Sequence, residues 1–171
     1  SLPPEFSGRP GEYIDFIIAE VLPEVAREKM AEFADIFCEK AIFELEDSRR
    51  YLEAAKTLGL GLKIHADEIE ALGGAGLAAS VGAVSAEHLL KASAQDLAAM
   101  AAAGVIAVCL PLTAFVLKEP YANARGMIDK GLAVALASDL NPGSCYSQSI
   151  PLIFPIAVLY MGLSFAETPL A

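Results

Sequence analysis

The sequence predicts an α/β fold with parallel strands, and two observations indicate it. Short apolar runs, several of which follow a helix-ending glycine, recur along the chain, and stretches with helical periodicity separate them. Such runs are typical of strands that are buried on both faces of a parallel sheet. Short connections between alternating strands and helices place the helices outside the sheet. We therefore predict five βα units.

The apolar runs set the order of the predicted elements. They predict strands near residues 34–39, 62–67, 83–87, 105–110 and 132–138. The stretches with helical periodicity predict helices at residues 12–29, 48–58, 74–80, 93–103 and 121–130, and a last one within 148–164. Pro23 should kink or split the first helix, because proline cannot donate the backbone hydrogen bond of a helix interior. Ser93 with Asp96 three residues later resembles a cap at a helix start.

The length of the chain favours a partial (β/α)8 TIM barrel. A complete barrel needs roughly 250 residues, and this chain has 171. It begins directly in a proline-rich loop and stops just past an apparent helix start. We expect one partial-barrel catalytic domain over residues 1–171, corresponding to the second half of a larger barrel. An open three-layer sheet is the competing architecture.

Composition excludes several classes of function. The chain has 12 Lys and Arg against 22 Asp and Glu, a net charge of -10, whereas a nucleic-acid surface needs clustered basic residues. No basic run exceeds Arg49-Arg50, which also argues against binding to an acidic membrane surface. Residues 97–117 and 140–166 carry no charge and are long enough to span a bilayer. Glycine and proline interrupt both stretches, so we expect a buried core and no membrane contact.

The first residues and the cysteines indicate the compartment. The start of the chain lacks the basic residues and the apolar segment of a secretory signal. Cys38, Cys109 and Cys145 are odd in number and far apart, so we expect free thiols in a reducing compartment. A cytoplasmic location is the expectation.

Polar side chains gather where the predicted strands end, and functional groups of parallel α/β proteins collect at those ends. Both histidines of the chain, His65 and His88, follow adjacent strands, and Asp139 follows the fifth. Two imidazoles and a carboxylate suit a zinc or iron ion. Glu68 lies three residues beyond His65, where it can serve as a general acid or base. The alternative is that the histidines pack in the core and that Glu68 is a solvated loop charge.

The turn Asn141-Pro142-Gly143-Ser144 follows the last predicted strand. Its small residues and backbone N–H groups could hold a carboxylate or phosphate of a ligand. A plain turn that also caps a helix is the alternative. The sequence contains no dinucleotide fingerprint, phosphate-binding loop or CxxC pair.

Four segments together resemble one known family. They are Lys63-Ile64-His65-Ala66-Asp67-Glu68, Gly73-Gly74-Ala75, Gly82 to Leu89, and Ser138-Asp139-Leu140-Asn141-Pro142-Gly143-Ser144. In these motifs the chain resembles the imidazolonepropionases, which are metal hydrolases of the amidohydrolase superfamily that act in histidine degradation. The resemblance implies hydrolysis of the cyclic amide C–N bond of 4-imidazolone-5-propanoate, a small-molecule substrate, to N-formimino-L-glutamate.

The resemblance also implies a role for each residue of the expected site. His65 and Asp139 match metal ligands for one Zn²⁺ or Fe³⁺ ion, and Glu68 matches the acid/base that also contacts the substrate. His88 matches a catalytic histidine rather than a ligand. The remaining matches are expected to bind the substrate or product: Asn141, Gly143 and Ser144.

The chain departs from the family pattern in several places. It has no His-x-His pair, so the remaining histidine ligands are expected from a missing N-terminal part. The C-terminal segment that completes a small β domain is also missing, and Gly76 stands where the family often has Glu. The fragment is expected to be inactive alone, and its unpaired strand edges favour association into homo-oligomers. The alternatives are an amidohydrolase acting on another cyclic amide or an aminated ring, and a non-catalytic α/β module.

Overall fold

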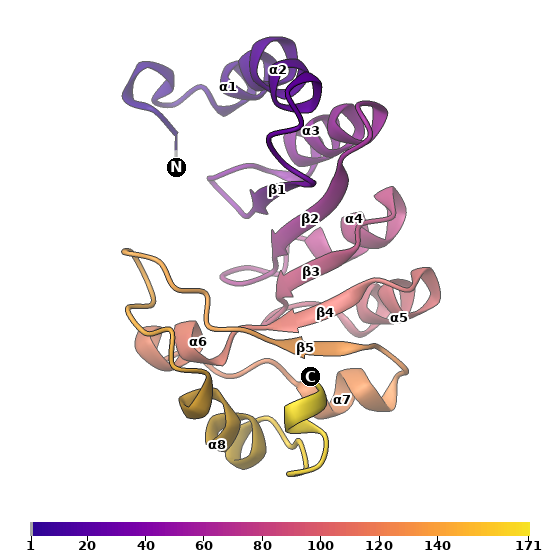
Figure 1. Ribbon diagram of the computed structural model, residues 1–171, viewed down its shortest axis with the longest axis vertical. Coiled ribbons are helices and arrows are strands. Elements are labelled where there is room, and N and C mark those ends of the chain that lie inside the picture. Colours follow the sequence, from indigo (N-terminus) through magenta and orange to yellow (C-terminus); the bar gives the residue numbers. More distant parts are fainter. Residues whose placement is uncertain (1) are drawn as a thin grey trace.

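A computed structural model describes residues 2–171, which contain one parallel sheet of five strands in the order β1-β2-β3-β4-β5 (Figure 1). The strands are β1 (Phe33–Cys38), β2 (Gly61–Ala66), β3 (Ser85–His88), β4 (Ile106–Cys109) and β5 (Val134–Leu136). Each strand pairs in parallel with the next strand along the chain. The prediction of five parallel strands is confirmed.

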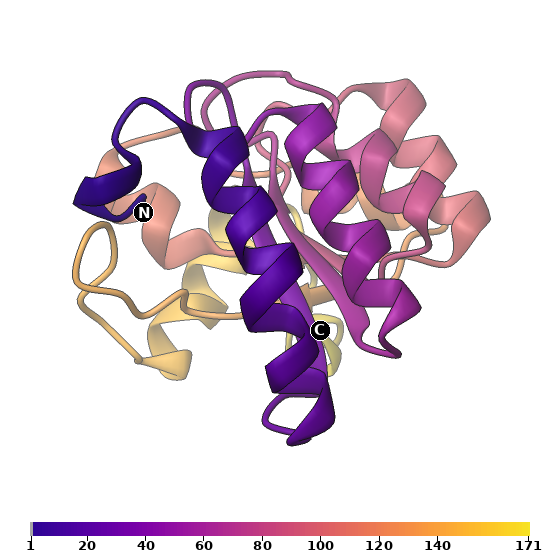
Figure 2. The ribbon, with the colours of Figure 1, turned by 90° about the horizontal axis from the view of Figure 1, so that it is seen from above.

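Helices separate successive strands, with two of them before β1 and two between β4 and β5. They are α1 (Pro10–Phe16), α2 (Leu22–Arg27), α3 (Leu45–Thr57), α4 (Gly74–Val81), α5 (Ala94–Ala103), α6 (Pro111–Leu117), α7 (Ala124–Asp129) and α8 (Ile150–Tyr160). Figure 2 shows α3, α4 and α5 side by side along one face of the sheet. The strand order never reverses, whereas a doubly wound open sheet reverses at its ligand-binding switch point. The fold is therefore part of a (β/α)8 barrel and not a three-layer open sheet.

The two faces of the sheet differ in polarity, as β2 illustrates. Leu62, Ile64 and Ala66 are buried on the helix side, where fully buried residues of α3 meet them. The alternate residues Lys63 and His65 point to the other face, because side chains in a strand alternate between faces. Most in-register neighbours on this second face are polar: Lys63 pairs with Asp35 and Ser85, and His65 pairs with Glu87 and with the aromatic Phe37.

The N-terminal helix changes geometry where the sequence predicts an interruption. A π-helical segment, η2 (Ile17–Val21), joins α1 to α2, and Pro23 lies in the first turn of α2. A wider π turn accommodates a residue that cannot donate a backbone hydrogen bond. Two short 3-10 helices, η1 (Pro4–Phe6) and η3 (Thr168–Leu170), lie near the ends of the chain.

One predicted boundary is corrected, and one helix was not predicted. β3 begins at Ser85 and not at residue 83, because Ala83 and Val84 still belong to the connection after α4. Helix α6 was not predicted, and Pro111 occupies its first turn, a favoured place for proline. The last helix, α8, begins at Ile150 and ends at Tyr160, and so lies within residues 148–164 as predicted.

The uncharged stretches are divided among several elements. Residues 97–117 cover most of α5 together with β4 and α6, and residues 140–166 contain a long loop before α8. Within residues 2–171, none of the helices combines the length and apolarity that crossing a bilayer requires. Cys38, Cys109 and Cys145 are buried and unpaired, which confirms the expectation of free thiols.

Candidate active site

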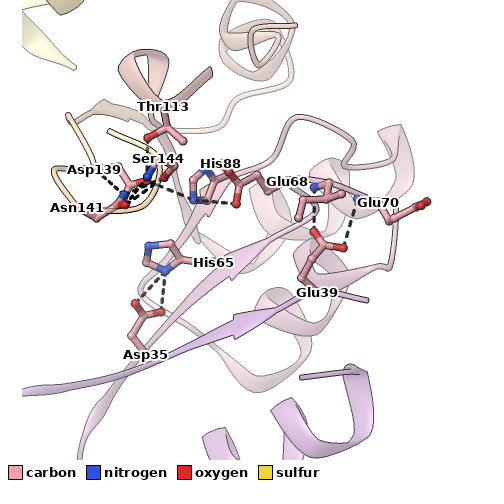
Figure 3. A network of polar contacts seen from close by, with 11 residues as sticks. Asp35, Glu39, His65, Glu68, Glu70, His88, Thr113, Asp139, Asn141 and Ser144 are labelled. Atoms are coloured by element: carbon pink, nitrogen blue, oxygen red, sulfur yellow. Dashed lines mark hydrogen bonds and ion pairs between the residues drawn. The ribbon is translucent and has the colours of Figure 1, made fainter. Parts of the chain in front are cut away.

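A cavity of about 350 Å³ opens at the carboxyl ends of the strands. Six of the seven residues expected in a site line it together: His65, Glu68, His88, Asp139, Asn141 and Ser144. Asp35, Ile36 and Phe37 of β1 complete the lining. Figure 3 shows these polar side chains converging from the strand ends and from the loop after β5. Gly143 is exposed and does not line the cavity.

His65 is oriented by a carboxylate from the neighbouring strand. Its Nδ1 atom lies 2.8 Å from Oδ2 and 3.1 Å from Oδ1 of Asp35. Burial lowers the pKa of His65, but the hydrogen bond to Asp35 and its negative charge outweigh burial, so the pKa is raised overall. An Nδ1–H that donates to Asp35 leaves the lone pair on Nε2, the tautomer required of a metal ligand.

His88 is a neutral imidazole between two acidic groups. Its side chain is 4% exposed, and its Nε2 atom lies 3.6 Å from Oε2 of Glu68 and 3.9 Å from Oδ2 of Asp139. Burial, together with the positive charge of His65, lowers the pKa of His88 to about 4. The two histidine rings lie 5.3 Å apart, centroid to centroid.

Glu68 has the acidity of a general acid or base. Burial, and then the negative charge of Asp139, raises the pKa of Glu68 to about 7. A carboxyl group with this pKa is present in both protonation states near neutral pH, so it can both accept and release a proton. The expectation that Glu68 is only a solvated loop charge does not agree with its burial, since its side chain is 12% exposed.

Asp139 is held by a residue that the sequence did not single out. The hydroxyl of Thr113, which is buried in α6, donates to Oδ2 of Asp139 over 2.8 Å. This contact leaves Oδ1 of the carboxylate without a hydrogen bond from the described side chains. Thr113 follows the fourth predicted strand but was not among the expected site residues, and proline at the start of its helix was the available signal.

The turn after β5 is closed by the Asn141 side chain. Its Oδ1 atom accepts hydrogen bonds from the backbone N–H groups of Gly143 (2.8 Å) and Ser144 (2.7 Å), and its amide donates to Oγ of Ser144 over 2.9 Å. These N–H groups are therefore engaged within the turn, as in an Asx turn. The side chains of Asn141 and Ser144 are the groups that this turn offers at the cavity.

Three strand ends beside the cavity have left-handed backbone. The φ angles are 51° at Asp67, 72° at His88 and 55° at Asp139. This conformation costs about 1–2 kcal/mol for a residue with a Cβ atom. Strained backbone that persists at neighbouring positions is common at functional sites. It turns the chain sharply after β2, β3 and β5, where the candidate residues lie.

The donor atoms of the site fit a metal ion in chemistry. His65 keeps a free Nε2, Asp139 has an oxygen available, and neutral imidazole and carboxylate suit zinc or iron. Ligand atoms of Asp35, His65 and Glu87 also lie within 4.8 Å of one another. Glu87, however, accepts a hydrogen bond from Ser85 over 2.6 Å and pairs with the Lys63 ammonium at 2.7 Å, so a cation already neutralises it.

Sequence comparisons connect the chain to one group of proteins. No family model matches it. The imidazolonepropionase of Bacteroides thetaiotaomicron is 60% identical over 168 residues, which cover 98% of this chain and 40% of that protein. The imidazolonepropionase of Clostridium tetani is 59% identical over 96% of the chain and 39% of its own length.

Solved structures with the same fold share little sequence. The N6-methyl-AMP deaminase from Arabidopsis thaliana matches with a TM-score of 0.71 at 17% identity, over 94% of this chain and 48% of the deaminase. An amidohydrolase from a Sargasso Sea environmental sample matches with a TM-score of 0.62 at 17% identity, over 91% of the chain and 38% of that protein. These matches support the partial-barrel fold. The chain spans about 40% of the length of its curated relatives, and its resemblance to the imidazolonepropionase family is confirmed over 98% of its own residues.

Proposed function

We propose that this chain forms the catalytic part of an imidazolonepropionase-type hydrolase that acts in histidine degradation. The reaction adds water across the cyclic amide C–N bond of 4-imidazolone-5-propanoate and yields N-formimino-L-glutamate. One observation carries the proposal: His65, Glu68, His88 and Asp139 line a single cavity in a chain that is 60% identical to an imidazolonepropionase. That relative is named imidazolonepropionase, which supports imidazolone propanoate as the substrate.

In this proposal His65 and Asp139 hold one Zn²⁺ or Fe³⁺ ion. Such an ion polarises a carbonyl group and makes bound water acidic near neutral pH. Catalytic zinc sites usually have three protein ligands, whereas this proposal assigns two. The second of the two histidines in the sequence, His88, is assigned to catalysis and not to the metal. We infer that further ligands come from a preceding part of the protein, that residues 1–171 form a partial-barrel domain, and that it is inactive alone.

Glu68 moves the proton in the proposed reaction. Its carboxylate accepts a proton from the attacking water and returns it to the ring nitrogen as the C–N bond breaks, so the proton balance closes on one side chain. A pKa of about 7 suits both transfers. In this proposal His88 stays neutral and donates a hydrogen bond to the attacked carbonyl oxygen. Asn141 and Ser144 bind the substrate beside it, and Gly143 contributes by closing their turn.

The remaining expectations belong to the same proposal. An enzyme of this metabolic class would act in the cytoplasm, with the small molecule as its partner. Association of copies is supported by side chains on α8 and near the end of the chain that are apolar and exposed, among them Leu159 (73%) and Phe165 (85%). Sedimentation of the chain at several concentrations measures that association.

A hybrid protein tests the activity. These 171 residues replace the matching segment of the Bacteroides thetaiotaomicron imidazolonepropionase, which supplies the rest of the barrel. We expect turnover of imidazolone propanoate but not of hydantoins, and about one equivalent of zinc or iron in the protein. Glu68→Gln should lower kcat by about 100-fold or more, the usual contribution of a general acid or base. Glu46→Gln, at an exposed position of α3, is the control.

Two results would contradict the proposal. Turnover of a hydantoin in preference to imidazolone propanoate would favour another amidohydrolase. A folded hybrid with less than about half an equivalent of metal and no turnover would favour a non-catalytic module. The coding sequence upstream of this segment offers an independent check, since we expect it to encode a His-x-His pair.

A further inference from the structure

Two buried carboxylates lie on either side of the loop that carries Glu68. Glu39 follows β1 and Asp67 follows β2, and both are 0% exposed. Within residues 2–171 neither carboxylate forms a salt bridge with Lys, Arg or His. Neither lines the cavity. A buried carboxylate costs several kcal/mol unless hydrogen bonds compensate it, so the partners of these two groups show what they do.

Asp67 binds the far end of the loop. Its Oδ1 atom accepts hydrogen bonds from the N–H groups of Gly73 (2.8 Å) and Gly74 (3.2 Å), and its Oδ2 atom accepts one from Ala75 (2.9 Å). These N–H groups begin α4, where the helix dipole also favours a negative charge. The Asp67 carboxylate thus closes the loop onto the helix that follows it.

Glu39 binds the near side of the loop from a different strand. Its Oε2 atom accepts a hydrogen bond from the N–H of Ile69 (2.9 Å), and its Oε1 atom accepts from Glu70 (3.2 Å) and from Lys40 (2.9 Å). Figure 3 shows Glu39 reaching the backbone of this loop on the side away from the cavity. The residues on both sides of Glu68 are therefore fixed by carboxylate-to-backbone hydrogen bonds.

The same loop is also tied to the strand end that carries His88. The carbonyl oxygen of Asp67 accepts from the N–H of Lys91 over 2.8 Å, and that of Ala66 accepts from Leu89 over 3.1 Å. The backbone of residue 68 is therefore held relative to β1, to α4 and to the segment after β3. From this backbone its side chain reaches toward His88, whose Nε2 atom lies 3.6 Å from Oε2 of Glu68.

We propose that Glu39 and Asp67 are positioning residues that hold the Glu68 carboxyl group at the cavity, an inference that rests on the proposed function of Glu68. Their six hydrogen bonds from backbone N–H groups replace the solvation of two charges, and five of the six come from residues 69–75, which directly follow Glu68. A reacting group held in its productive geometry avoids an entropic cost at the moment of reaction. Neither residue touches the substrate.

Two variants in the hybrid protein test this assignment. Asp67→Asn and Glu39→Gln keep size and shape, and asparagine also tolerates the left-handed backbone of residue 67. Each amide places an NH₂ group, itself a donor, where a carboxylate oxygen accepted from a backbone N–H group. It therefore disrupts the hydrogen bonds from Glu39 and Asp67 to residues 69–75, which we call the clamp. We expect kcat to fall about 10- to 100-fold, as for supporting residues around active sites, with KM and bound metal nearly unchanged. Glu70→Gln is the control, because its exposed side chain lies in the same loop outside the clamp.

A second measurement keeps the test decisive if a variant folds poorly. In the unsubstituted chain, the amide protons of Ile69, Glu70, Gly73, Gly74 and Ala75 should exchange more than about tenfold more slowly than in an unstructured peptide. Glu39→Gln should accelerate exchange at the first two, and Asp67→Asn at the last three.

Three outcomes overturn the assignment. Fast exchange of these amides in the unsubstituted chain removes the clamp itself. Values of kcat within about threefold of the hybrid in both variants, while Glu68→Gln is inactive, show that the clamp does not act on catalysis. Full activity of Glu68→Gln shows instead that the proposed function of Glu68 has failed.

Discussion

The Nδ1 atom of His65 lies 2.8 Å from Oδ2 of Asp35, a contact that joins β2 to β1 in the lining of the cavity. Asp35 precedes the strand end by several residues, so it reaches His65 only because the two strands pair with Phe37 opposite His65. The contact directs one ring nitrogen at β1 and leaves the other for the cavity. Orientation of a histidine ligand by a carboxylate is a common feature of metal sites.

Replacing Asp35 should weaken the proposed metal site without removing a ligand. We expect Asp35→Ala in the hybrid protein to reduce metal affinity about 10- to 100-fold, because the His65 ring loses its orientation and part of its basicity. The metal affinity of Asp35→Asn should lie between those of the alanine variant and the unsubstituted hybrid, since an amide oxygen can accept the same hydrogen bond but carries no charge. Competition with a chelator of known affinity measures the change. Equal affinity in all three proteins would show that Asp35 does not support a metal ligand.

Thr113 offers a parallel test on Asp139. Thr113→Val keeps the volume of this buried side chain but removes the hydroxyl that donates to Oδ2 of Asp139 over 2.8 Å. We expect metal affinity and kcat in the hybrid to fall about tenfold. Thr113→Ser, which keeps the hydroxyl, is the matched variant and should stay close to the unsubstituted hybrid. If the serine and valine variants behave alike, the hydroxyl has no such role.

The sequence predicts the strands well because their signal is local. The runs at residues 105–110 and 132–138 each contain the observed strand, β4 or β5. Helix α6 escaped prediction because Pro111–Leu117 is almost entirely apolar and so lacks the polar face that gives a helix its periodicity. Only its proline in the first turn indicated a helix start.

The residues of the candidate site also divide into those that the sequence predicts and those that it does not. His65, Glu68, His88 and Asp139 could be found because each lies at or just beyond a strand end, and parallel strands bring these ends together. Asp35 and Thr113 could not, because their roles depend on register between strands and on a helix that one sequence does not reveal. Strand interiors with an acidic residue are unusual, and that was the one signal available for Asp35.

A core substitution tests the helix side of the sheet. Leu52 of α3 is fully buried among residues of β1 and β2. Leu52→Ala should lower the free energy of unfolding by about 2–5 kcal/mol, because it removes buried methyl groups and leaves a cavity. Leu159→Ala, at a position that is 73% exposed, should change it by less than about 0.5 kcal/mol. Urea unfolding of the 171-residue chain measures both, and equal effects would contradict the packing described.

Acid should weaken the attachment of the C-terminal segment through Glu167. The guanidinium of Arg125 donates to both carboxylate oxygens, at 2.9 and 3.1 Å, and this contact, followed by hydrogen bonds from the backbone and side chain of Ser164, lowers the pKa of Glu167 to about 2. A carboxyl group whose pKa is depressed by folding binds protons more weakly in the folded than in the unfolded state. Its contribution to stability is therefore complete above its unfolded pKa of about 4.3 and is lost as the pH falls toward 2.

Glu167→Gln isolates this contribution. At pH 6 the variant should unfold at a lower urea concentration than the unsubstituted chain. The difference should shrink through pH 4 and be mostly lost by pH 2, where Glu167 is protonated in the unfolded chain and about half protonated in the folded one. Asp129→Asn, which removes the other carboxylate that pairs with Arg125, is the control for loss of a surface charge. A difference of the same size at pH 6 and pH 2 would show that the ionised carboxylate of Glu167 is not its source, because a contribution from ionisation must fade as the carboxylate is protonated.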